Sequence, residues 1–277
     1  MCSSSYTGVT TMPGSVFRKG LRDARRGLIW WAIGIAAYVG LIASVWPSVR
    51  DNPSLKKLTE SYPEALKAFV SFGDQLNFGT ASGYLGAELF SFMVPLLLLI
   101  AGIGAGARAV AAEEEAGTLD LLLAHPVSRT RVALEKLAVV VLQLLALGTI
   151  LWLSLWISAM AFNMDVSGLH LLAAVTSSVL LALAFGALAA IIGAATGRHG
   201  VAITACASLA LASYLVNAPA PLVHGLDKIR WISPWYHYAA GDPLRKGLAV
   251  DHSLVLATLF VAAAIIVPVV FRRRDLA

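Results

Sequence analysis

Side chains that could perform chemistry are few in this sequence and lie far apart. A serine hydrolase inside a membrane needs the order Gly-x-Ser-Gly and a histidine base. The sequence around Gly79, Ser82 and Gly83 does not have that order, and no histidine is suitably placed. Cys2 lies in a tail and Cys206 in an apolar run, so we expect neither a disulfide framework nor a metal site. The sequence therefore predicts no catalytic residue and no bound metal or cofactor in this chain.

The sequence also gives little support for a carrier driven by protons or sodium, which needs ionisable residues or broken helices near the middle of the membrane. Pro95 and Pro268 could break helices, but no acid lies beside either one. Glu88 is the one acid that looks buried in an apolar run. It is either a functional acid or, as we favour, a side chain that reaches the outer interface. No Gly-Lys-Ser or Gly-Lys-Thr occurs for a phosphate-binding loop, so energy for any work must come from another protein.

The segment from Glu113 to Arg129, EEEAGTLDLLLAHPVSR, has the most informative pattern in the chain. Its three glutamates extend an apolar run beyond the lipid, and Gly117 then ends that helix. Thr118 can cap a short second helix, which Pro126 ends. Ser128 can cap the next apolar run. The pattern predicts a short helix that is held between two membrane spans and presented to the cytosol.

Leucines are too dense in this short helix for a turn that faces only water. They are Leu119, Leu121, Leu122 and Leu123. We interpret the helix as a docking element for a soluble partner. The acidic group before it, Glu113, Glu114 and Glu115, is expected to face cations of that partner or the basic inner surface near Arg129 and Arg131. The alternative is an ordinary helical hairpin that lies on the inner membrane surface.

The composition indicates which elements carry this segment. Apolar and aromatic residues make up 58% of the 277 residues, and charged residues make up 13%, about half the roughly 25% of a soluble domain. The charges leave six apolar runs, each long enough for the ~20 residues that cross a bilayer core. The sequence therefore predicts an all-α membrane protein with six transmembrane helices. They are expected at about 28–48, 85–107, 132–162, 169–196, 200–217 and 253–271.

Positive charges predict the orientation of these spans. With both termini in the cytoplasm, thirteen of the 21 lysines and arginines fall on the inner side, and the others are diluted over two long outer loops. The positive-inside rule therefore favours cytoplasmic termini. Membrane orientation also explains the net charge of +5 better than nucleic-acid binding does, because the cations lie at the ends of spans.

Three features are expected beside or between the spans. Residues 1–15 form a flexible tail before a single domain, 16–277. Residues 16–28 have an apolar face opposite a basic one, which is typical of an interfacial amphipathic helix that runs into the first span; a simple cationic stop is the alternative. The apolar face consists of Val16, Phe17, Gly20, Leu21, Ala24 and Leu28. A stripe of small residues in the fourth span, Gly186, Ala190, Gly193 and Gly197, favours close helix packing.

The outer segment 217–252 contains four prolines and also many aromatic residues that prefer the membrane interface. These aromatic residues are Trp231, Trp235, Tyr236 and Tyr238. We expect short helices here that re-enter the outer leaflet, which is possible only where protein shields the backbone.

The segment 113–136 resembles the pattern that joins the second and third spans of bacterial ABC-2 type permeases. The matching residues are Glu114 and Glu115, Gly117 to Leu119, Leu121 to Leu123, Pro126 to Arg129, and Lys136. The six spans, the basic helix before the first span, Ser233-Pro234-Trp235-Tyr236 and the terminal Arg-Arg-Arg-Asp-Leu support the resemblance. His125 departs from the pattern, because the family often has an apolar residue there.

The resemblance implies a permease subunit of a bacterial cytoplasmic membrane that works as a homodimer or heterodimer. Two cytosolic ABC ATPase subunits bind the ATP and Mg²⁺, and this chain binds no cofactor. The short helix 118–125 inserts into a groove on the ATPase and relays its closure to the spans, most often for export of lipids, glycans, peptides or natural products. Two other classes stay open from the residues: a secondary transporter or channel, and an intramembrane enzyme or assembly factor.

Overall fold

The computed structural model describes residues 15–52, 63, 78–115, 117, 128–218 and 229–273. These residues form helices and turns, with no strand among them. The long helices are α1 (Ser15–Arg50), α5 (Met93–Glu115), α7 (Arg129–Ala161), α8 (Gly168–Thr196), α9 (His199–Asn217) and α12 (Val250–Arg273). The short ones are α4 (Ala81–Leu85), the π-helix η1 (Gly86–Phe90), the 3₁₀-helix η3 (Arg230–Ile232), α10 (Pro234–Ala239) and α11 (Pro243–Lys246).

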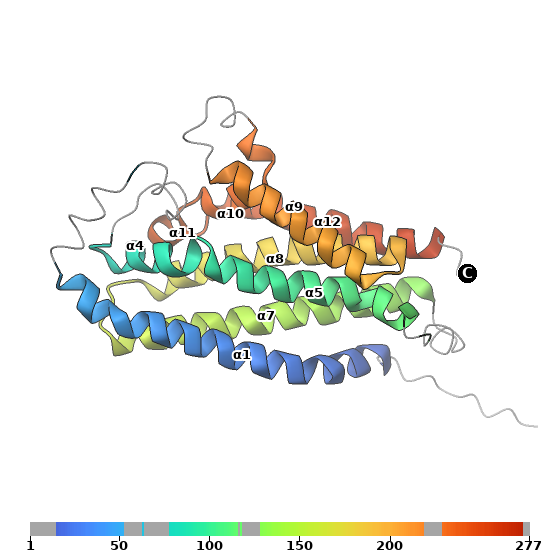
Figure 1. Cartoon of the computed structure of the whole chain (residues 1–277), viewed down its shortest axis with the longest axis horizontal. Coiled ribbons are helices and arrows are strands. Elements are labelled where there is room, and N and C mark those ends of the chain that lie inside the picture. Colours follow the sequence, from blue (N-terminus) through green and yellow to red (C-terminus); the bar gives the residue numbers. More distant parts are fainter. Residues whose placement is uncertain are drawn as a thin grey trace, which may run out of the picture.

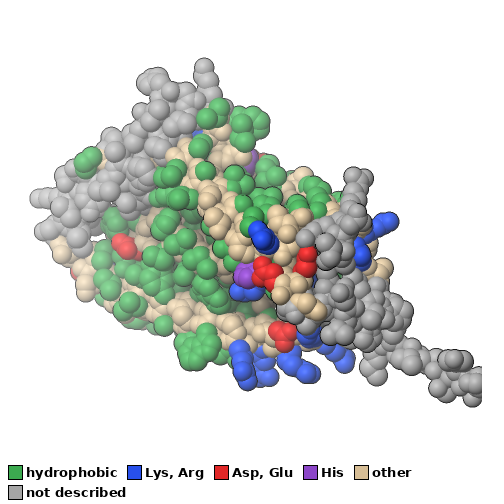
Figure 2. Space-filling view, turned by 45° about the vertical axis from the view of Figure 1, so that its right-hand side comes forward, with side chains coloured by type: hydrophobic (Ala, Val, Ile, Leu, Met, Phe, Trp, Pro, Cys, Tyr) green, Lys and Arg blue, Asp and Glu red, His purple; other side chains and the backbone are tan. Residues whose placement is uncertain are grey.

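Six helical stretches in the described part of the chain are long and apolar enough to cross a membrane, which confirms the predicted all-α architecture with six spans. They run along the long axis of the molecule (Figure 1). At one end α1 begins, α5 ends, α7 begins, α8 turns into α9, and α12 ends. We call this the basic end, because lysines and arginines gather there while apolar side chains cover the middle (Figure 2). The opposite end carries α4, α10 and α11.

Helix α1 combines the predicted amphipathic segment and the first span in one continuous helix of 36 residues. At 1.5 Å per residue it is about 54 Å long, well beyond the ~30 Å hydrocarbon core. The half-buried residues Phe17, Gly20 and Ala24 lie on the same stripe as the buried Ile35 and Val39 further along. Because these positions share one helical face, the helix continues without a break and packs on α7 along its length. The apolar face predicted for the lipid interface is thus partly covered by protein.

The second span is irregular before α5 begins. The Ser91 N–H donates to the Gly86 carbonyl at 2.7 Å, five residues back, which is the π-helical pattern of η1. Pro95 lies in the first turn of α5, as the third residue of that helix. A proline ring collides with the carbonyl four residues earlier, here that of Ser91, in a regular helix. The irregularity predicted at Pro95 therefore lies just before it.

Helices α5 and α8 form the centre of the bundle through backbone contact. A Cβ atom on Gly106 would lie 1.9 Å from the Gly186 carbonyl oxygen, and one on Gly102 would lie 2.7 Å from that of Ala182. A Cβ on Gly193 would lie 2.9 Å from the Ala107 oxygen. The small-residue stripe predicted in the fourth span therefore packs within this chain, against glycines and alanines of α5.

The opposite end is closed by short helices, as expected before the last span. Tyr238 of α10 is buried, and its hydroxyl donates to the Phe90 carbonyl at 2.6 Å. Burial raises the pKa of Tyr238, so the hydroxyl keeps the proton that this hydrogen bond uses. The Ser233 hydroxyl donates to the Ser213 carbonyl of α9 at 2.8 Å. These contacts shield the irregular backbone with protein, which is the condition expected for a re-entrant segment.

Candidate functional site

The segment singled out in the sequence is held at the basic end between α5 and α7. Helix α5 ends at Glu115, and Gly117 has a φ of +63°, the left-handed conformation that glycine adopts readily after a helix. The Gly117 N–H donates to the Glu114 carbonyl at 3.0 Å. Helix α7 begins at Arg129, and the Ser128 hydroxyl accepts from the Arg131 N–H at 3.3 Å, which confirms the predicted cap.

Seven of the predicted site residues lie outside the described residues. They are Thr118, Leu119, Leu121, Leu122, Leu123, His125 and Pro126. For Glu113 the structure describes the helical backbone only, whereas Glu114 and Arg129 both belong to the described part and each has an interaction partner. The structure therefore places the two attachment points of the segment, and its docking role stays a prediction.

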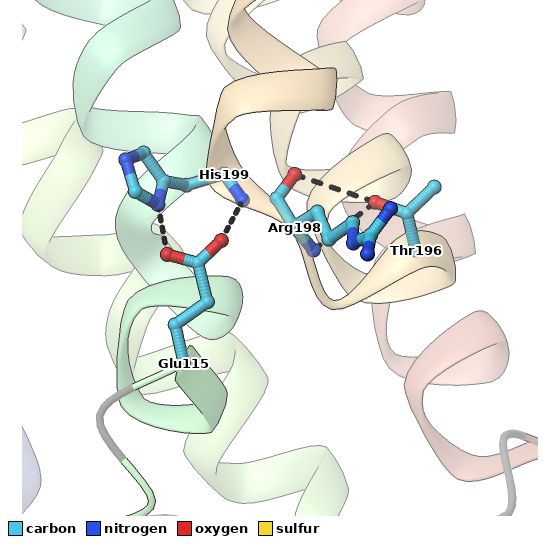
Figure 3. A network of polar contacts seen from close by, with 4 residues as sticks. All are labelled: Glu115, Thr196, Arg198 and His199. Carbon is cyan, nitrogen blue, oxygen red and sulfur yellow. Dashed lines mark hydrogen bonds and ion pairs between the residues drawn. The ribbon is translucent and has the colours of Figure 1, made fainter.

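Glu115, the last residue of α5, binds the start of α9 (Figure 3). One carboxylate oxygen accepts from the His199 backbone N–H at 3.0 Å, and the other contacts the Nδ1 atom of the His199 ring. The N-cap residue of α9 is Arg198, which makes no side-chain capping bond. The carboxylate of Glu115 thus supplies the negative charge and the acceptor that a helix N-terminus favours.

The turn between α8 and α9 holds His199 in place for this contact. Gly197 ends α8 with a φ of +67°, and its N–H donates to the Gly193 carbonyl at 2.8 Å. The Thr196 hydroxyl donates to the Ile192 carbonyl at 2.8 Å and accepts from the Arg198 N–H at 3.3 Å. Figure 3 shows this turn next to the Glu115 contact. The tight turn predicted at residues 197–200 is confirmed.

A second carboxylate, on α7, binds the start of α1 in a similar way. The Phe17 N–H in the first turn of α1 donates to Glu135 at 3.1 Å. The other oxygen of Glu135 accepts from the Arg131 guanidinium at 2.9 Å. The two helices that flank residues 118–127 therefore each hold the first turn of another helix: α5 holds α9, and α7 holds α1.

For Glu115 these contacts differ from the prediction for the acidic group, whereas the role of Glu113 and Glu114 stays a prediction. We expected Glu113–Glu115 to face a partner or the basic surface near Arg129 and Arg131. The structure shows Glu115 on His199, and it shows Arg131 paired with Glu135 instead. The physical reason is that α9 starts without a side-chain cap of its own, so the nearest carboxylate serves it. An arginine at a helix start, where serine or aspartate is usual, was the signal available in the sequence.

The four helices α1, α5, α7 and α9 enclose a groove of about 900 Å³. Its lining is mostly leucine, isoleucine, valine, alanine and glycine, with Trp31, Phe92, Tyr214 and Trp235 among the aromatic members. Among the described residues, four charged ones line it, all near the basic end: Lys19, Asp23, Arg108 and Lys136. A groove of this size is within the range of small-molecule sites. The groove can bind a molecule with a long apolar part. Its described lining brings together no nucleophile and base for covalent chemistry.

Comparison with known protein families shows which family this sequence matches. The sequence profile described as ABC-2 family transporter protein matches residues 15–276, nearly the whole chain. The chain belongs to the ABC-2 family of transporter proteins. A comparison with curated proteins gave no match.

Family membership confirms the resemblance seen in segment 113–136, and it favours the ABC transporter over a carrier, a channel or an intramembrane enzyme. This ABC-2 protein is the membrane-spanning permease of an ABC transporter and crosses the membrane several times. It is a transport component and is not itself the catalytic subunit. ABC-2 permeases generally work with an ABC ATPase, so a partner of that kind is expected here too.

Proposed function

We propose that this chain forms the translocation path of an exporter for hydrophobic or amphipathic cargo in a bacterial cytoplasmic membrane. Two cytosolic ABC ATPase subunits bind ATP and Mg²⁺ and drive the cycle, and a second permease subunit, identical or not, completes the path. The chain itself carries no cofactor. Both termini, and with them the basic end, face the cytoplasm.

One observation carries the coupling part of this proposal. The segment 118–127 is tied to α5 and α7, and these helices hold the first turns of α9 and α1 through Glu115 and Glu135. Helices α9 and α1 form two walls of the groove. A displacement of the segment by a closing ATPase pair would therefore reach both walls through carboxylate contacts. Leu119, Leu121, Leu122 and Leu123 supply the apolar surface for the ATPase in this mechanism.

The contact between Glu115 and His199 can be tested without knowing the cargo. We expect ATP to change the rate at which a maleimide labels Ala207→Cys, an exposed α9 position that lines the groove. Glu115→Ala, which removes both contacts with His199, should reduce this ATP effect about fivefold or more, the usual scale of coupling between two sites. His199→Ala removes the ring contact and keeps the backbone N–H bond, so it should reduce the ATP effect less. Loss of the exposed ring contact should cost only about 0–1 kcal/mol of stability, and loss of the acceptor for the His199 N–H in Glu115→Ala about 0.5–2 kcal/mol.

The matched control for this experiment is Arg198→Ala, one residue away, whose side chain does not cap α9. It should keep the ATP effect, and all variants should recover equal amounts of ATPase. An unchanged ATP effect in both His199→Ala and Glu115→Ala would remove this contact from the coupling route.

The proposed orientation can be tested by cysteine labelling in a chain whose own two cysteines are replaced by serine. Asp165→Cys lies in the exposed loop between α7 and α8, and Gly200→Cys lies in the first turn of α9, where a Cβ meets no atom within 4 Å. We expect an impermeant maleimide to label Asp165→Cys in intact cells and Gly200→Cys only after lysis. The reverse pattern would place the basic end outside.

A further inference from the structure

The groove between α1, α5, α7 and α9 has a strongly asymmetric lining. Its lining runs from Phe92, just before α5, along that helix to Ala112. The sixteen positions from Phe92 to Arg108 alone span about 24 Å, most of the ~30 Å hydrocarbon core. The end near Phe92 also has Tyr214 and Trp235 in its wall. The charged residues in the lining are confined to the other end. An occupant that fits both ends must be elongated, apolar along most of its length, and charged at one end.

The position of the Arg108 side chain gives the sign of that charge. A Cβ on Gly104 would lie 3.7 Å from the Arg108 Nη2 atom, so the guanidinium folds back over Gly104, one turn deeper into the groove than its own Cα. Arginines near the ends of spans usually extend toward water instead. Arg108 has no ion-pair partner among the residues that the structure describes. A cation in this position favours an anionic partner, because ionisable groups at membrane depth are normally paired.

Two lysines reinforce this charge from the neighbouring walls. Lys19 of α1 and Lys136 of α7 line the same end of the groove, and Asp23 is the one acid among the lining residues that the structure describes. Three cations and one acid leave this end with a charge of +2 within the described lining. A carboxylate or phosphate here would be attracted to the end as a whole, and a cationic head group would be repelled.

We propose that this groove binds a long-chain amphipathic anion, with its carboxylate or phosphate near Arg108 and its hydrocarbon chain along α5 toward Trp235. The proposal rests on the transport function above, because it names the class of cargo that the path accepts. The small lining residues Gly104, Ala105 and Ala109 leave room for a chain beside α5. The anion comes either from a lipid of the inner leaflet or from a free amphiphile in the cytosol.

Brominated probes test this proposal with the full-length permease alone. Bromine quenches tryptophan fluorescence at short range, and both Trp31 and Trp235 line the groove. In neutral detergent we expect dibromostearate to quench with an affinity about tenfold higher than the matched dibrominated alkylamine, the scale of one charge-assisted contact. Arg108→Gln should abolish this preference, and Arg108→Lys should retain most of it. Replacing Trp31 and Trp235 by phenylalanine should remove the quenching itself.

The matched control is Arg26→Gln, an exposed α1 position at the same end that does not line the groove. It should keep the full preference for the anion. A second arm repeats the titration in nanodiscs with a brominated anionic phospholipid against a brominated zwitterionic one, and the arm that shows the preference identifies the source of the anion. Equal affinities for anion and amine, or the same preference in Arg108→Gln, would overturn the proposal.

A different occupant would give another result. If a second copy of the chain fills the groove, neither probe quenches, and Ala207→Cys forms a disulfide between copies. That outcome would also overturn the proposal. The quenching assay contains no ATPase and no ATP. A negative result would therefore not count against the proposed coupling, and a negative result in the coupling experiments would not count against anion binding.

Discussion

Gly106→Ala is expected to destabilise the bundle severely, although it adds a single methyl group. The new Cβ would lie 1.9 Å from the Gly186 carbonyl oxygen and 2.7 Å from its carbon, and both are backbone atoms that cannot rotate away. Helices α5 and α8 would have to separate along their closest contact. Overpacking normally costs about 1–3 kcal/mol, and a backbone collision exceeds this. We expect little monodisperse protein after extraction and a large drop in the midpoint of thermal unfolding.

Gly104→Ala is the matched control, with the same substitution two residues away on the same helix. Its Cβ would meet only the flexible end of Arg108, at the ordinary distance of 3.7 Å. Because alanine favours a helix interior by about 1 kcal/mol over glycine, stability should stay equal or rise. Equal losses in the two variants would mean that the α5–α8 contact is not as close as described.

Leu122→Asp is expected to abolish recovery of the partner ATPase while the permease still inserts into the membrane. The substitution places a carboxylate where the proposed contact buries an apolar side chain, at a cost of roughly 2 kcal/mol or more to the interface. That cost corresponds to about 30-fold weaker binding. The measurement is a pull-down of the ATPase by tagged permease, with membrane insertion determined in parallel.

Leu122→Met is the matched control, because a flexible apolar side chain of similar volume should keep the contact. A hairpin that only rests on the inner leaflet makes a different prediction. In that case Leu122→Asp lowers the amount of inserted permease or changes nothing, and ATPase recovery per permease stays constant. Normal insertion with undiminished recovery and transport would remove the coupling role from this segment.

The sequence by itself determined the number of spans and the stop signals between them. Long uncharged runs must become helices in a bilayer, because only a helix satisfies its backbone groups within one segment. Gly117, Ser128 and Gly197 act through their own backbone or hydroxyl group. Their effect on where a helix ends or begins is therefore local. The leucine-rich segment 118–125 is also a local pattern, so the sequence could indicate the segment and the family of the chain. It could not indicate which groups contact the segment.

Only the tertiary structure decided which groups meet between helices. Glu115 and His199 are 84 residues apart, and Phe17 and Glu135 are 118 apart, so no local pattern links either pair. The surroundings of Arg108 are also a tertiary result, because the helices that form its groove with α5 are far from it in the sequence. Helix packing brings four helices around this groove, and contacts of α5 with α8, such as Gly106 to Gly186, hold α5 in its place beside it.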